Sequence, residues 1–216
     1  MSDSSSRDNF IDQIDENKPF LENWCGMRKL GELVLPVGWR DTVAVSDGDS
    51  DGLLDFLDRP GVEASPGYRV QLVYTSRARA GAEVTTASVS PELVLHRTFK
   101  NACCEGLTFN PPEDDAPEGF RSYTLHSFAL PRMIGMLRAK EVDLTPEVHL
   151  QQAQDALARD DQYLAMFHVV EARERGCPLP LCFDLEINVL SCLALREQAN
   201  SYYTWFQQRC PDQSLL

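Results

Sequence analysis

The clearest chemical pattern in the sequence is a run of aspartates in the first quarter of the chain. Asp47, Asp49 and Asp51 are spaced by two residues, and Asp58 stands twelfth from the first of them. Carboxylates in this spacing can converge on a calcium ion when a loop curls around it. The twelfth residue is not the usual bidentate glutamate, however, and the same aspartates suit the first turn of a short helix over 51–57. We therefore expect no metal site, with divalent-ion-dependent binding as an alternative.

A second chemical possibility is a cysteine nucleophile. Cys103 and Cys104 are adjacent, and His96 and His126 are candidates for the base that a reactive thiolate needs. Nothing in their spacing requires such a site, and the sequence contains no Gly-rich phosphate loop, serine elbow, zinc motif or dinucleotide fingerprint. We expect no cofactor, and an enzyme with a cysteine/histidine site between two domains remains an alternative.

Charge and composition limit the class of partner. The 216 residues carry 20 Lys and Arg against 33 Asp and Glu, a net charge of −13, which excludes nucleic-acid binding by attraction to phosphate. No apolar stretch is long enough to cross a membrane, the N-terminus carries no signal sequence, and the seven cysteines are odd in number. These features predict a cytoplasmic protein with reduced thiols and no membrane insertion.

The acidic residues are concentrated near the N-terminus. Residues 1–65 hold 14 acidic and 6 basic residues, a net of −8. Such a face attracts a partner protein with a basic surface, and aromatic residues near the C-terminus have the size and polar tips of interface residues. The candidate interaction residues are Asp47, Asp49, Asp51, Asp55, Tyr202 and Trp205.

Apolar periodicity predicts an α+β fold, with a mostly antiparallel sheet followed by a C-terminal region of four helices. We divide the chain into a disordered or short helical lead-in over 1–24, an α+β domain over 25–140 and a helical-hairpin region over 141–216. The predicted strands cover 32–37, 41–46, 68–75, 82–89 and 121–128, with 68–89 forming a hairpin whose basic tip is 77–81. Leu93–His96 fits either a strand or a helix that begins after Pro91.

The C-terminal region has clear helix start and stop signals. Thr145 can act as an N-cap and Pro146 suits the first helical position. The predicted helices, which form two antiparallel hairpins, cover 146–158, 162–175, 181–196 and 198–209. The third is apolar on more than one side, so we expect it to be the buried helix.

An offset of 34 residues relates the two hairpins. It pairs Pro146 with Pro180 and Ala165 with Ala199, and 34 residues is the period of tetratricopeptide repeats. Residues 146–212 therefore resemble two tetratricopeptide-like hairpins, although His149 stands where that family favours a large apolar residue. The alternative is an ordinary helical bundle packed on the N-terminal sheet. Two repeats would need the first domain or a partner to cover an end.

These observations favour a non-catalytic function. We expect a cytoplasmic protein–protein interaction protein, such as an adaptor, a secretion chaperone or an immunity-type inhibitor, that presents an acidic surface to another protein. The identity of the partner and the oligomeric state are left open by the sequence.

Overall fold

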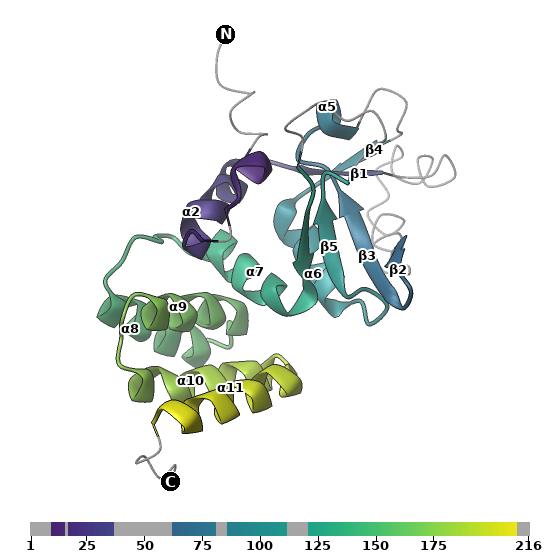
Figure 1. The fold of residues 1–216 in the computed structure, drawn as a ribbon. Helices are drawn as coiled ribbons and strands as arrows, with labels where there is room; N and C mark the ends of the chain where they lie inside the picture. Colours follow the sequence, from purple (N-terminus) through teal and green to yellow (C-terminus); the bar gives the residue numbers. More distant parts are fainter. Residues whose placement is uncertain (1–9, 16, 37–61, 81–85, 112–120, 211–216) are drawn as a thin grey trace. The chain divides into compact units, whose positions relative to one another are not determined.

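The computed structural model describes residues 10–15, 17–36, 62–80, 86–111 and 121–210. The chain divides into two compact units, Met1–Leu130 and Pro131–Leu216 (Figure 1). The first unit contains the strands and the second contains helices, which confirms the α+β class. The division falls about ten residues before the one expected from the sequence, so the helix α7 (Leu130–Arg138) belongs with the helical unit.

The described part of the first unit contains a two-stranded and a four-stranded sheet. In the smaller sheet β1 pairs with β4, and the larger sheet has the order β2-β3-β5-β6. All pairs are antiparallel except β3 with β5. The strands are β1 (Leu33–Pro36), β2 (Val62–Ser65), β3 (Tyr68–Val73), β4 (Thr86–Val89), β5 (Gly106–Phe109) and β6 (Tyr123–His126). The helices are η1 (Phe10–Gln13), α2 (Phe20–Trp24), η2 (Cys25–Lys29), α5 (Arg77–Ala80), α6 (Pro91–Lys100) and η3 (Ser127–Ala129).

The predicted hairpin over 68–89 is wrong. The expected basic tip forms the short helix α5, and the following strand β4 pairs with β1 instead of β3. The neighbours of β3 are β2 and β5. Alternation of apolar residues defines a strand but carries no information on its partner, which explains the error. The segment after Pro91 is a helix, one of the two possibilities that the sequence left open.

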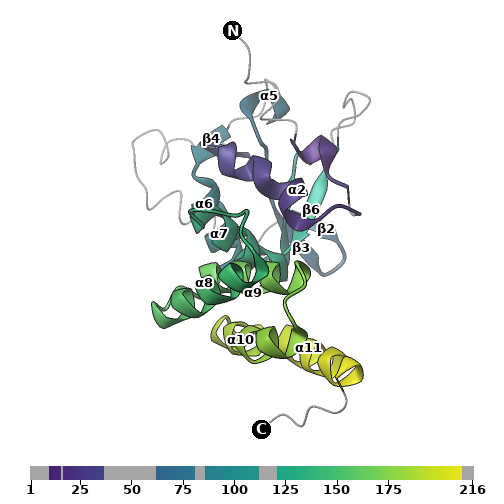
Figure 2. The same cartoon turned by 90° about the vertical axis from the view of Figure 1, so that its left-hand side faces the viewer.

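Aromatic residues connect the N-terminal helices to one face of the larger sheet. Trp24 of α2 packs against Phe10, Phe109 and Tyr123, with ring centroids 6.0, 5.6 and 5.3 Å away. Figures 1 and 2 show α2 and α6 on the same side of this sheet. The chain before β1 is therefore part of the core of the first unit, with Ile11 and Met27 fully buried.

The second unit contains α7 and two helical hairpins. Its further helices are α8 (Pro146–Ala158), α9 (Gln162–Glu174), α10 (Leu179–Cys192) and α11 (Arg196–Arg209). Thr145 caps α8 as predicted, because its hydroxyl accepts a hydrogen bond from the Val148 N–H at 3.4 Å. The starts of α9 and α11 lie 34 residues apart. No helix in the described part of the chain is long and apolar enough to span a bilayer.

The most buried helix is α9, not the third predicted helix, α10. Nine residues of α9 are buried against five of α10. Helix α9 packs against α8, which precedes it in the chain, and against α10, which follows it, so it is covered on two sides. Gly135 of α7 also lies directly against α9, where a Cβ atom would be 2.1 Å from the Tyr163 carbonyl oxygen. The position of a helix among its neighbours, not its own hydropathy, determines which helix is buried.

Candidate functional site

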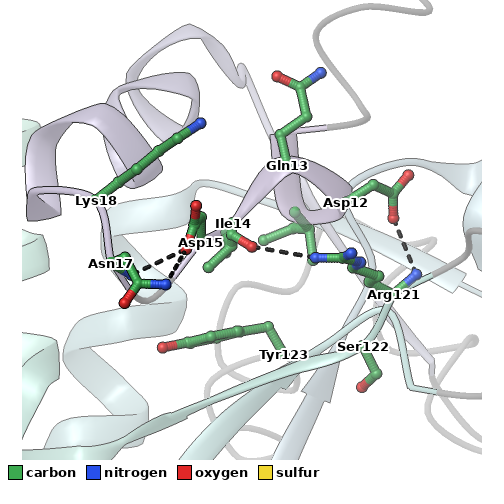
Figure 3. A pocket seen from close by; sticks show the side chains of 10 residues that line it. Asp12, Gln13, Ile14, Asp15, Asn17, Lys18, Arg121, Ser122 and Tyr123 are labelled. Atoms are coloured by element: carbon green, nitrogen blue, oxygen red, sulfur yellow. Dashed lines mark hydrogen bonds between the residues drawn. The ribbon is translucent and has the colours of Figure 1, made fainter.

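The first unit contains a pocket of about 680 Å³ beside the start of β6. It is formed where η1 and the loop that leads to α2 approach the residues before and within β6 (Figure 3). Its described lining residues are Ile11, Asp12, Gln13, Ile14, Asp15, Asn17, Lys18, Arg121, Ser122 and Tyr123. Six of these residues carry a charged group or an amide, so the pocket is polar.

Asn23 of α2 holds the loop on one side of the pocket in place. Its Oδ1 accepts a hydrogen bond from the Asp15 N–H at 3.0 Å, and its Nδ2 donates to the Asp15 carbonyl oxygen at 2.8 Å. The Asp15 carboxylate accepts hydrogen bonds from the backbone N–H and the Nδ2 of Asn17, both at 3.0 Å and both at Oδ1. These hydrogen bonds, with smaller effects of Lys18 and Arg121, lower the pKa of Asp15. Asp15 is therefore ionised at neutral pH.

The other side of the pocket is built around Asp12. Its carboxylate forms an ion pair with Arg79 of α5 and accepts a hydrogen bond from the Arg121 backbone N–H at 3.0 Å. The Arg121 guanidinium donates to the Ile14 carbonyl oxygen at 3.3 Å. Residues more than 100 positions apart thus meet here. No sequence pattern indicates this site, because neither Asp12 nor Asp15 belongs to a motif with residues near it in the chain.

The candidate cysteines and histidines lie in different settings. Cys104 is buried, whereas Cys103 is exposed and lines a second pocket of about 290 Å³ with Arg69 and Glu105. His126 forms a hydrogen bond through Nδ1 with the Tyr68 hydroxyl at 2.8 Å. The two side chains meet across β5 because Gly106 lies between them, and a Cβ there would be 3.2 Å from the Tyr68 oxygen. His96 lies half-buried on α6.

The predicted C-terminal interaction residues form a stack on α11. The rings of Tyr202 and Trp205 are 5.4 Å apart at an angle of 21°. The guanidinium groups of Arg173 and Arg209 lie 5.9 and 4.7 Å from the Trp205 ring centre. Burial, followed by the negative charge of Glu186, raises the pKa of the Tyr202 hydroxyl. Both aromatic residues are half-buried, so they contribute to packing as well as to the surface.

Neighbouring aromatic residues join α11 to α10. Phe183 stacks on Phe206 at 3.9 Å and lies 6.0 Å from Tyr203. Phe206 is buried, whereas Tyr203 and Leu181 keep 40% and 59% of their surface exposed. The last hairpin therefore combines a buried aromatic seam with exposed apolar side chains.

The remaining predicted site residues, Asp47, Asp49, Asp51 and Asp55, lie outside the described residues, as does the predicted strand 41–46. Within the described ranges, no three His, Cys, Asp or Glu side chains gather in a way that could hold a metal ion. Comparisons with known protein families, with curated proteins and with solved structures found no match to this chain.

Proposed function

We propose that this chain is a non-catalytic cytoplasmic protein that binds another protein, as an adaptor, a secretion chaperone or an immunity-type inhibitor does. In this proposal residues 146–212 act as a tetratricopeptide-like pair of hairpins and present part of the binding surface. The aspartates at 47, 49, 51 and 55 provide an acidic surface that attracts a basic partner.

The exposed side of the last hairpin is the observation that carries this proposal. In α11 only Phe206 is fully buried, although the helix also carries two tyrosines and a tryptophan. Exposed Tyr203 and Leu181 lie in the same hairpin as the Arg209–Trp205 pair. Aromatic residues and arginine are enriched at protein interfaces, because they offer a large contact area with polar tips. This combination supports a protein partner.

Repetition within the helical unit gives further support. Asp160 and Ala194, 34 residues apart, both adopt left-handed backbone conformations, with φ of 62° and 60°. Each follows a helix that ends with the same pair of backbone hydrogen bonds, as described by the Schellman motif. Helical repeats are commonly used as extended binding surfaces. Seven cysteines without a disulfide are typical of a reducing compartment, which supports the cytoplasmic location.

The proposal can be tested by affinity capture from a lysate of the source organism across a series of salt concentrations. Three proteins should be compared: the wild type, a Leu181→Ser/Tyr203→Ser variant, and a variant with Asn at the four aspartates. Val62→Ser is the matched control, since Val62 is also an exposed apolar residue, 56% accessible, but lies on β2 of the first unit. We expect one stoichiometric partner that is lost at high salt, lost from the hairpin variant and retained by the control. A partner retained by both test variants would contradict the proposal.

A second candidate is an enzyme with a cysteine nucleophile. It is favoured by Cys103, whose pocket also contains Arg69 and Glu105. Alkylation with iodoacetamide at a pH below the usual thiol range, followed by mass spectrometry, would test it. A nucleophile requires Cys103 to react much faster than Cys25 and Cys192, which are also exposed. Equal rates for the three would remove this candidate.

A further inference from the structure

The charged groups around the larger pocket are unequally compensated. The Asp12 carboxylate is neutralised by Arg79. Lys18 forms no ion pair with another described side chain, and the Arg121 guanidinium donates to the neutral Ile14 carbonyl oxygen. Both hydrogen bonds to the Asp15 carboxylate are made at Oδ1, which leaves Oδ2 available. The described lining thus offers two cations and one carboxylate oxygen to a ligand.

Lys18, Arg121 and Asp15 line the same pocket. Figure 3 shows the Lys18 ammonium and the Arg121 guanidinium on either side of the Asp15 and Ile14 segment, with the Tyr123 ring beneath. Both cations lower the pKa of Asp15, which places them within electrostatic reach of its carboxylate. The Tyr123 ring is fixed from the other direction by Trp24, at 5.3 Å. The pocket therefore has exposed charged groups at its rim, and the Tyr123 ring in its lining is held by Trp24.

A ligand that pairs with these groups must carry two negative charges and one positive charge. Two carboxylates would pair with Lys18 and Arg121, and an ammonium group would pair with Asp15, while the methylene groups between them would pack on Tyr123. An acidic α-amino acid has this pattern and a net charge of −1. The volume of about 680 Å³ also admits a dipeptide that ends in an acidic residue.

We propose that this pocket binds an acidic amino acid, free or as the C-terminal residue of a short peptide. Lys18 and Arg121 bind its two carboxylates and Asp15 binds its ammonium group. The binding is separate from the protein–protein interaction proposed above, because it uses only side chains of the first unit that surround one cavity.

Calorimetric titration of the full chain with matched small molecules tests the proposed pattern. L-Glutamate has all three groups, glutarate lacks the ammonium group, and 4-aminobutyrate lacks one carboxylate. We expect saturable binding of L-glutamate with a Kd of about 1 mM or tighter, and at least about tenfold weaker binding of the other two. Tighter binding of L-alanyl-L-glutamate than of L-glutamate would assign the site to peptides, and the reverse order to the free amino acid. No saturable binding of either compound would overturn the proposal.

Variants then connect the binding to the pocket. Asp15→Asn should weaken the binding of L-glutamate at least about tenfold and leave the binding of glutarate unchanged or tighter. Only L-glutamate has an ammonium group that pairs with the Asp15 carboxylate. Lys18→Met and Arg121→Gln should weaken the binding of both ligands. Arg69→Gln, another exposed arginine of the same unit, is the control and should bind as the wild type does. Circular dichroism verifies that each variant is folded. Equal loss of both ligands in Asp15→Asn, or the same loss in the control, would contradict the assignment.

Discussion

The Nδ1 atoms of His149 and His168 lie 2.8 Å apart in the interior of the helical unit. The two side chains come from α8 and α9, and they are 0% and 3% exposed. One ring donates its Nδ1 proton to the other, so the accepting ring must be neutral, and the hydrogen bond is lost when both rings are protonated. Burial lowers the pKa of each histidine to about 4, and the positive charge of Arg175 acts in the same direction on His149. The Val142 carbonyl and Asp143 offset only part of this effect.

This pair predicts a loss of stability in mild acid. The folded state resists protonation down to about pH 4, whereas unfolded histidine binds a proton below about pH 6.5. The unfolded state therefore holds more protons in this window, and stability falls as the pH decreases through it, by roughly 3 kcal/mol for each histidine. Urea unfolding between pH 7 and 4 should show this decrease for the wild type beyond that of a His149→Leu/His168→Phe variant. Parallel pH profiles for the two proteins would contradict the prediction.

Gly135 of α7 should not tolerate a side chain. Alanine normally favours a helix over glycine by about 1 kcal/mol. Here its Cβ would lie 2.1 Å from the Tyr163 carbonyl oxygen and 2.6 Å from the Cβ of Phe167. We expect the clash to dominate, so that Gly135→Ala lowers the free energy of unfolding by about 3 kcal/mol in urea denaturation. Gly31→Ala is the control and should change stability by less than about 0.5 kcal/mol, since nothing lies within 4 Å of its added Cβ.

Replacement of Ala194 by glycine should stabilise the protein. Its φ of 60° is costly for alanine, and glycine adopts this conformation without a steric penalty. Ala194→Gly should therefore raise the free energy of unfolding by up to about 1 kcal/mol. Ala158→Gly, a change of the same chemistry at the last residue of α8, should lower it by up to about the same amount. Thermal unfolding of both variants measures the difference. Destabilisation by Ala194→Gly would contradict the left-handed backbone at this position.

The ion pair between Arg173 and Glu186 should behave as a buried pair. The Arg173 Nε donates to Glu186 Oε2 at 2.9 Å, and Glu186 is 4% exposed. Burial raises the pKa of Glu186 despite the nearby arginine. Arg173→Met leaves an uncompensated carboxylate and should cost about 3 kcal/mol. Addition of Glu186→Leu should recover most of this loss, as a double-mutant cycle would show. A loss in the double variant equal to the sum of the losses in Arg173→Met and Glu186→Leu would mean that the pair does not interact.

Helix positions in the C-terminal part could be predicted from the sequence because their signals are local. Thr145 and Pro146 mark the start of α8 within a few residues, and the apolar spacing of α9 repeats over short distances. The strand signal in 68–75 was equally local and was correct. Strand β5 was missed, since all four of its residues are buried and it shows no alternation.

The pairing of the strands and the location of the pocket could be found only from the tertiary structure. The parallel pairing of β3 with β5, the His149–His168 hydrogen bond and the burial of α9 all depend on which segments lie side by side. The same holds for the pocket, where Asp15 and Arg121 are brought together from opposite ends of the first unit. The sequence by itself determined the net charge, the fold class and the positions of the four C-terminal helices to within about four residues, because these depend on composition or on neighbouring residues. The tertiary structure decided the strand partners and the charged pocket, because contacts between residues that are far apart in the chain leave no local pattern.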